Sequence, residues 1–186
     1  RLNAYMSSEL ITHEAFHAID DDVLDWVHTD GAETNPWLSV QMPGGTAWDP
    51  PSQVKKVAIF NRIGNNLHER LSGPYGPFQI WVGQSPGDTH SNTSSVCYDV
   101  RPSSESEAGR GQPDGNLTID VDACDHIHLS PHRYPTEPCG PFIFDCDNLP
   151  GWFVTILLPG PNRIVNVAEV YLFASEISPS PPSPPP

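Results

Sequence analysis

The stretch that decides the fold covers residues 152–173 and reads WFVTILLPGPNRIVNVAEVYLF. Both of its ends are rich in β-branched and aromatic residues, which are the types that strands favour. Between them, residues 159–162 read PGPN, a turn sequence built from Pro, Gly and Asn. The stretch therefore predicts two successive strands, over residues 152–158 and 164–173.

The same pattern occurs elsewhere in the chain. Trp37–Gln41 alternates apolar and polar residues, and residues 54–60, 78–82 and 117–121 are rich in Val, Ile and Phe. Clusters of Gly, Pro and Asn bound these segments, and no helical pattern separates them. Residues 101–113 are polar and are expected to form an exposed loop. Short strands at this spacing predict an all-β sandwich or jelly roll.

Length and charge exclude several classes of protein. The chain has 186 residues, which is enough for one ordinary domain, and its formal net charge is −14. Such an acidic chain is a poor ligand for nucleic acid or anionic lipid. No apolar run approaches the roughly 18 residues that a membrane span requires. Because the chain begins at Arg1 and shows no signal peptide, we expect a processed or trimmed product.

Cysteines and sequons point to an oxidising compartment. The four cysteines are Cys97, Cys124, Cys139 and Cys146. None belongs to a C-x-x-C pair, so they predict two disulfides rather than a zinc knuckle, and three pairings are open. N-glycosylation sequons begin at Asn92 and Asn116. These features predict a secreted protein.

Residues 178–186 read SPSPPSPPP and cannot pack a core. Each Pro fixes φ near the polyproline II value, so the sequence predicts a stiff, extended tail. The predicted organisation is a globular domain over residues 1–177 followed by a Ser/Pro-rich stalk over residues 178–186.

Residues 13–17 read HEAFH, which matches the H-E-x-x-H pattern of zinc peptidases. On a helix, His13 and His17 would share a face and bind Zn²⁺, with Glu14 as the general base. Only twelve residues precede His13, however, and the extended pattern would require Gly and His where the chain has Asp20 and Val23. We therefore prefer the interpretation of two loop histidines beside an acidic cluster.

Two charged clusters have an open interpretation. Asp20, Asp21, Asp22 and Asp25 lie within six residues, so they form either a Ca²⁺-binding loop or a solvated turn. Arg62 and Arg70 are two of only nine basic residues. Their guanidinium groups suit either vicinal hydroxyls and carboxylates or ordinary surface salt bridges.

A series of blocks follows in chain order from about residue 4 to residue 174. They read AYMSS, HAIDDD, WVHT, NPWLSVQM, VKKVAIFNR, ERLSGPYGPFQIWVGQSPGD, VCYDV, GWFVTILLPG and VNVAEVYLF. Together they resemble the F-type lectin family and, more broadly, the discoidin or coagulation factor 5/8 type C superfamily. The resemblance implies an eight-stranded jelly-roll β-sandwich, galactose-binding-domain-like, with ligand loops at one end and no catalysis.

The resemblance also implies two sets of site residues. In the family a His and two Arg hold the hydroxyl groups of a fucose-like sugar, and the matching positions are His28, Arg62 and Arg70. A structural Ca²⁺ lies under the loops, and the matching positions are Asp20, Asp22, Asp25, the backbone of Ala168, and Glu169.

The chain departs from the family at several points. Where the family has adjacent cysteines between the two Arg, it has Asn65 and Asn66. A second family disulfide is replaced near Trp26 and at Ala168, and GGTAWDPPS is inserted at residues 44–52. The resemblance pairs Cys97 with Cys146, which leaves Cys124 to pair with Cys139. A sugar site also requires an aromatic platform, and the sequence does not place its candidates, Trp26, Trp48 and Tyr75.

The tail resembles the hydroxyproline-rich glycoproteins of green algal walls and flagellar surfaces. This implies hydroxylation and O-glycosylation at Pro179, Pro181, Pro182, Pro184, Pro185 and Pro186. It also implies an extracellular location, at a cell wall, flagellar surface or matrix, and self-association or contact with other surface glycoproteins through the tail.

These features predict a non-enzymatic, extracellular glycan-binding module on a glycosylated polyproline stalk. It would act as a structural or adhesive subunit of a cell-surface fibril or matrix. The first alternative is a free-standing, calcium-dependent fucose-type lectin, and the second is a zinc metallopeptidase.

Overall fold

The computed structural model describes residues 2–44, 51–62, 78–100 and 139–175. Within them the chain forms eight strands and one short 3-10 helix. In chain order these are β1 (Ala4–Met6), η1 (Ala15–Ile19), β2 (Trp37–Gln41), β3 (Ser52–Asn61), β4 (Phe78–Gly83), β5 (Ser95–Val100), β6 (Cys139–Gly151), β7 (Phe153–Leu157) and β8 (Val167–Ala174). The prediction of an all-β chain is confirmed.

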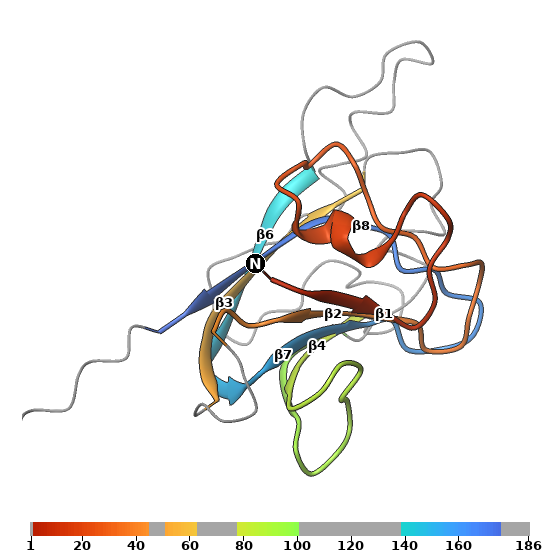
Figure 1. The fold of residues 1–186 in the computed structure, drawn as a ribbon. Helices are drawn as coiled ribbons and strands as arrows, with labels where there is room; N and C mark the ends of the chain where they lie inside the picture. The colour runs from red at the N-terminus through yellow and green to blue at the C-terminus, as the bar shows by residue number, and fades with distance from the viewer. Residues whose placement is uncertain (1, 45–50, 63–77, 101–138, 176–186) are drawn as a thin grey trace, which may run out of the picture.

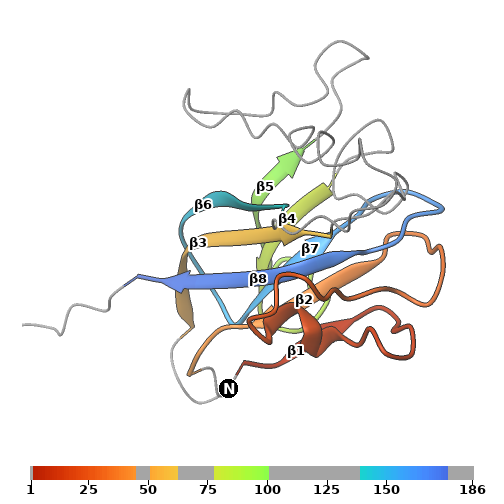
Figure 2. The same ribbon diagram turned by 90° about the horizontal axis from the view of Figure 1, so that it is seen from above.

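The strands form two sheets that pack face to face (Figures 1 and 2). One sheet has five strands in the order β1-β2-β7-β4-β5, and the other has three in the order β6-β3-β8. Every neighbouring pair is antiparallel. This is the predicted eight-stranded jelly-roll β-sandwich, in which each sheet buries one apolar face against the other.

The core lies between the two sheets. The inward side chains come from alternate strand positions, as the two-residue period of a strand requires. The five-stranded sheet supplies Leu38, Val40, Ile80, Val82, Val154 and Ile156, and the three-stranded sheet supplies Val57, Ile59, Phe144 and Val170. Burial of these side chains is the main favourable term in folding.

The predicted strands agree with the structure wherever it describes them, with one shift. The segments 54–60 and 78–82 lie inside β3 and β4. The predicted strand 164–173 begins later, at Val167, because the residues before it pair with another loop. The carbonyl of Val165 accepts the N–H of Thr29, and Arg163 exchanges backbone bonds with Glu33. The predicted strand 117–121, the loop 101–113 and the tail 178–186 lie outside the described residues.

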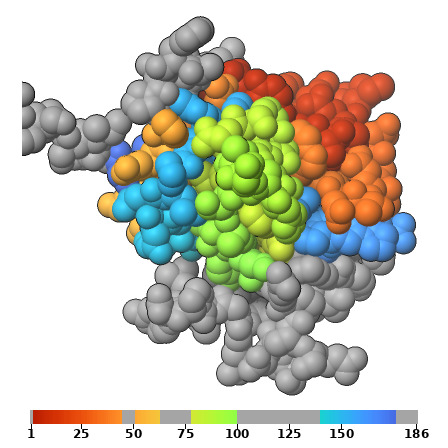
Figure 3. Space-filling view, turned by 90° about the horizontal axis from the view of Figure 1, so that it is seen from below, coloured from red at the N-terminus to blue at the C-terminus, as the bar shows by residue number. Residues whose placement is uncertain are grey.

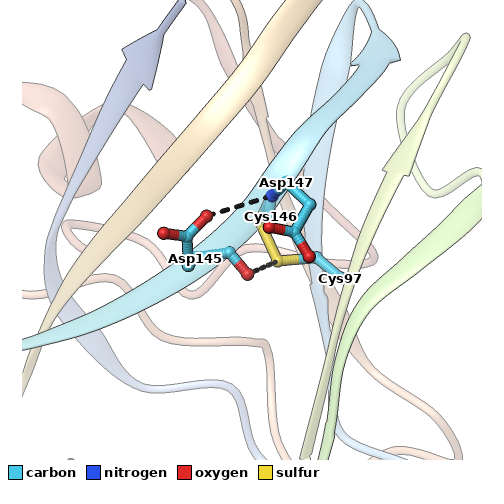
Figure 4. Close-up of a disulfide and its surroundings, with 4 residues drawn as sticks. All are labelled: Cys97, Asp145, Cys146 and Asp147. Carbon is cyan, nitrogen blue, oxygen red and sulfur yellow. Dashed lines mark hydrogen bonds between the residues drawn. A yellow bond between two sulfur atoms is a disulfide. The ribbon is translucent and has the colours of Figure 1, made fainter. Parts of the chain in front are cut away.

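A disulfide joins the two sheets along one edge of the sandwich. Cys97 on β5 and Cys146 on β6 are bonded, with their Cα atoms 4.8 Å apart (Figure 4). This is the pairing that the family resemblance implies. The other implied pairing, Cys124 with Cys139, falls partly outside the described residues because Cys124 does.

The β4–β5 loop folds across the outer face of the five-stranded sheet. The N–H of Gly87 donates to Oγ of Ser39 at 2.8 Å, and Ser39 also shares a hydrogen bond with Thr155 on the neighbouring strand. Gly87 has φ +71°, and a Cβ there would meet Trp37 at 2.8 Å, so only Gly fits this close approach. Residues 78–100, drawn in green, occupy the centre of this face in Figure 3.

Asp88 holds this loop together. Its carboxylate accepts hydrogen bonds from the backbone N–H of Gln84 and from the hydroxyls of Ser91 and Thr93. Partial burial favours the neutral acid, but these three bonds favour the carboxylate and hold the pKa of Asp88 below its ordinary value of 3.8.

We predict that Asp88→Asn lowers the melting temperature at neutral pH, because the amide has only one acceptor oxygen. The folded-state pKa of Asp88 is lower than the unfolded value, so its contribution is present above the unfolded pKa. It is lost as the pH falls through the folded pKa. The difference in melting temperature between the native chain and the Asp88→Asn variant should therefore become smaller below about pH 4. Asp30→Asn, at an exposed side chain, is the matched control. A difference that does not depend on pH would contradict this account.

Candidate functional site

The candidate site lies in the long connection between β1 and β2, which includes η1. This connection is fastened to β8, and Figures 1 and 2 show η1 beside that strand. The N–H of Val27 donates to the carbonyl of Val167 at 2.9 Å. Within the connection, the N–H of His28 donates to the carbonyl of His13 at 3.0 Å. Residues far apart in the sequence therefore form one cluster at this end of the sandwich.

Glu169 on β8 connects this strand to the turn that follows η1. Its side chain is 1 % exposed, and Oε2 accepts the backbone N–H of Asp21 at 2.9 Å. Asp21 follows η1 and has φ +68°, a left-handed conformation that turns its N–H toward β8. Asp20 and Glu169, which the family resemblance places at one metal site, are therefore neighbours across the chain.

Burial strongly raises the pKa of the Glu169 carboxyl group. Desolvation raises the pKa of its carboxyl group, the N–H groups of Val170 and Asp21 oppose that shift, and the charges of Asp20 and Asp21 add to it. The resulting pKa is about 7. A buried carboxylate that faces other carboxylates requires either a positive partner or a proton. A bound cation would supply the positive partner.

Carboxylates of the acidic turn after η1 stabilise the turn by accepting hydrogen bonds from its own backbone. Asp20 accepts the N–H of Asp22 at 3.0 Å, Asp22 accepts the N–H of Leu24 at 2.9 Å, and Asp25 accepts the N–H of Trp26 at 2.7 Å. These side-chain-to-backbone bonds are typical of Asp-rich turns. They bring the carboxylates of Asp20 and Asp25 toward a common point.

His17 lies at that point. Its Nδ1 is 2.9 Å from Oδ2 of Asp25 and 3.2 Å from Oδ2 of Asp20, and its Nε2 is 3.5 Å from Oε2 of Glu14. Among the described residues, His17, Asp20 and Asp25 form the group whose ligand atoms lie within 4.8 Å of one another. Asp22, which the resemblance also assigned to the metal, is not in this group.

The donor set fits a hard cation. Carboxylate oxygens of Asp20 and Asp25 lie close together at the turn, and Glu169 adjoins them through its hydrogen bond with the N–H of Asp21, although it is not in the same group of close ligand atoms. Ca²⁺ takes oxygen ligands of this kind together with backbone carbonyls. Ala168, whose backbone the resemblance assigns to the metal, is buried next to Glu169 on β8. The imidazole of His17 competes for the same carboxylates, so cation binding would displace its Nδ1.

A second cluster of rings adjoins the acidic turn. Trp26 stacks on His13 with 5.0 Å between centroids and 19° between planes, and Cζ of Arg62 lies 4.2 Å above the Trp26 ring. The His28 ring is 6.5 Å from that of His13. His28 and Arg62, two of the three predicted sugar ligands, are thus related through the rings of His13 and Trp26 that lie between them in this series of contacts. Arg70, the third, lies outside the described residues, as do Trp48 and Tyr75.

The hydrogen bonds of His28 define what it offers to a ligand. Its Nδ1 donates to the carbonyl of Thr29 at 2.5 Å, since a carbonyl oxygen only accepts. This tautomer leaves Nε2 as an acceptor when the ring is neutral. Arg62 supplies donors in a planar fork. One acceptor and several donors suit adjacent hydroxyl groups, which both donate and accept.

The HEAFH segment does not form a zinc-peptidase helix. His13 precedes η1, which spans only five residues, and His17 lies inside it. Their rings belong to different clusters, because His13 stacks on Trp26 and its Nδ1 donates to the Trp26 carbonyl, whereas His17 faces Asp20 and Asp25. The preferred interpretation was two loop histidines beside an acidic cluster: His13 and His17 both lie near Asp25, but His17 belongs to η1 rather than to a loop.

Sequence reasoning missed the positions of three residues here. It weighed His13 and His17 as zinc ligands, preferred two loop histidines beside an acidic cluster, and left Trp26 unplaced. A signal was available: Trp26 stands two residues before His28 in WVHT, so both belong to one short segment. The contacts of Trp26 with His13 and Arg62 join distant segments, which no local pattern reports.

Comparison with known proteins identifies the fold. No protein-family model matches the sequence, and a search of curated proteins finds no match. Among solved structures, the chain is similar to a fucolectin from striped bass serum, with a TM-score of 0.59 and 19 % identity over 95 % of this chain. That match spans 46 % of the fucolectin chain, about half its length.

Two smaller proteins match over nearly their whole length. The lectin domain of lectinolysin, solved with Lewis B antigen, has a TM-score of 0.56 and 19 % identity over 93 % of this chain and 92 % of its own. A fucose-binding module from Streptococcus pneumoniae has a TM-score of 0.55 and 15 % identity over 94 % of both chains. The chain therefore has the jelly-roll fold of these lectin and carbohydrate-binding domains.

Proposed function

We propose that the chain is a non-enzymatic glycan-binding module. The observation that carries the proposal is the ring cluster in which Arg62 lies against Trp26, Trp26 stacks on His13, and His28 neighbours His13. Solved structures with this fold bind fucose, Lewis antigens or galactose. No catalytic role is required of any residue in the cluster.

In this proposal His28, Arg62 and Arg70 hold a fucose-like sugar. Nε2 of His28 accepts a hydrogen bond from one hydroxyl, and the guanidinium groups donate to neighbouring hydroxyl oxygens. Charge-assisted bonds of this type are worth about 1.5–3 kcal/mol each. Sugar specificity beyond a pair of adjacent hydroxyls is set by residues of the loops around this cluster.

We further propose that Ca²⁺ is a structural cofactor of the loop end. The carboxylates of Asp20, Asp25 and Glu169 and the backbone of Ala168 would hold it, and Asp22 would contribute at the outer side of the turn. A bound Ca²⁺ supplies positive charge to the buried carboxylate of Glu169. These residues then keep the β1–β2 connection on β8.

The wider context is an extracellular protein on a polyproline stalk. The Cys97–Cys146 disulfide supports an oxidising compartment, and Asn92 is exposed in the β4–β5 loop, as a glycosylation site must be. No helix of the described residues has the length and apolar character that a membrane span requires. The stalk, its hydroxylated prolines and its contacts would make the module a structural or adhesive subunit of a cell-surface fibril or matrix. A free-standing, calcium-dependent fucose-type lectin would share the same site.

The first test is direct glycan binding. We predict that the native chain binds fucose-type glycans on an array, and that Arg62→Ala weakens binding about tenfold or more, because it removes charge-assisted donors. Lys55→Ala is the matched control, since Lys55 is an exposed cation on β3 outside the cluster. The proposal fails if the native chain binds no glycan, or if Arg62→Ala and Lys55→Ala bind as the native chain does.

The second test is removal of the cation. A ligand bound only to the folded state stabilises it by about 2.7 kcal/mol at one hundred times its dissociation constant. For a chain of this size we predict that excess chelator lowers the melting temperature by about 5–10 °C and that added Ca²⁺ restores it.

The matched variants separate this site from general ionic effects. Glu169→Gln should abolish the response to chelator, whereas Asp147→Asn, on β6, should retain it. A melting temperature that chelator leaves unchanged in the native chain would remove Ca²⁺ from the proposal.

A further inference from the structure

The Trp26 indole contacts both a guanidinium group and an imidazole ring. Cζ of Arg62 lies 4.2 Å from the ring centroid, and the imidazole of His13 stacks at 5.0 Å with 19° between the planes. A guanidinium at this distance from an indole is attracted by the negative face of the ring. The face that Arg62 covers is not available to a sugar, so the contact with Arg62 gives Trp26 a role other than that of a stacking platform.

The Trp26 ring is itself held in place by its neighbours in the chain. Its backbone N–H donates to Oδ1 of Asp25 at 2.7 Å, and its carbonyl accepts from Nδ1 of His13 at 3.1 Å. The next residue, Val27, is buried, and its N–H is bonded to the carbonyl of Val167 on β8. The backbone that carries the indole is therefore anchored to the sandwich.

Arg62 comes from a different part of the chain. It follows the last residue of β3, where its backbone N–H is bonded to Oδ1 of Asn61. An arginine side chain has several rotatable bonds, and ordering it costs rotamer entropy. A surface that orders the guanidinium before a ligand arrives removes part of this cost from binding.

We propose that Trp26, in contact with both His13 and Arg62, is a positioning residue that orders the Arg62 guanidinium for glycan binding. This inference rests on the proposed function for its role, although the stack itself does not. Trp26 acts through Arg62 and requires no contact with the sugar.

The first measurement tests the stack without any ligand. The indole ring current should shift the Nε–H proton resonance of Arg62, assigned by its loss in Arg62→Lys, away from its ordinary position. Trp26→Leu should return that resonance to the ordinary position, and Trp26→Phe should return it only in part. Trp81→Phe, which changes an aromatic residue on β4, should leave it unchanged. An ordinary Arg62 resonance in the native chain would overturn the proposal.

The second measurement tests the role by a double-mutant cycle of glycan affinity. Trp26→Leu should weaken binding about fivefold or more in the native background, and much less in the Arg62→Lys background, because the coupling runs through the guanidinium. Trp26→Phe should rescue part of the loss. An equal loss in both backgrounds, or a loss that only follows a lowered melting temperature, would show a merely structural role and overturn the proposal. If the native chain binds no glycan, the proposed function fails and the positioning role fails with it, while the resonance still decides whether the stack forms.

Discussion

The hydrogen bond from the N–H of Asp21 to the carboxylate of Glu169 joins residues 148 positions apart in the chain. Through it, the turn after η1 is held against β8, and the neighbouring segment from Trp26 to Thr29 is laid beside the start of that strand. The backbone bonds from Val27 to Val167 and from Thr29 to Val165 hold the same connection, and Val27 is buried in the core. Together with the Asp21–Glu169 bond they fix the position of the β1–β2 connection on the sandwich.

The attachment also completes the sandwich. The disulfide between Cys97 and Cys146 closes the side where β5 meets β6, and the β1–β2 connection closes the opposite side, where β8 is the edge strand. An open edge strand presents unpaired N–H and C=O groups, so covering β8 protects it. The apolar core therefore packs between two sheets that are joined at β5 and β6 by the disulfide and covered at β8 by the β1–β2 connection. The loops of the candidate site extend from this sandwich.

The residues that attach the turn to β8 are acidic, and the same residues are the proposed ligands of Ca²⁺. A carboxyl group as buried as Glu169 disfavours its charged form, and the aspartates of the turn increase that effect. His17 Nδ1 donates a hydrogen bond to Asp20 and lies 2.9 Å from Oδ2 of Asp25, and Ca²⁺ would supply full positive charge. The same turn carries Asp25, which accepts a hydrogen bond from the backbone N–H of Trp26, so the acidic turn and the ring cluster share one short segment.

Much of the fold was predictable from the sequence, and less of the site. Strands such as β2, β3 and β4 follow from local composition, since alternation and β-branched residues act within a few positions. The start of β8 was placed three residues early, because Ile164 to Asn166 have strand composition but pair with the loop before β2. The short strand β1 and the 3-10 helix carry too few residues for a periodic signal. The neighbourhood of Asp20 and Glu169 came from family resemblance, whereas the stack of Trp26 with Arg62 is a tertiary contact that no local pattern encodes.

Amide hydrogen exchange at Asp21 tests the central attachment most directly. Asp21 is exposed, so slow exchange of its N–H would report the hydrogen bond to Glu169 rather than burial. The account predicts protection comparable with that of amides inside β8, and its loss in Glu169→Ala. Exchange of the Asp21 amide at the rate of a free loop in the native chain would contradict it.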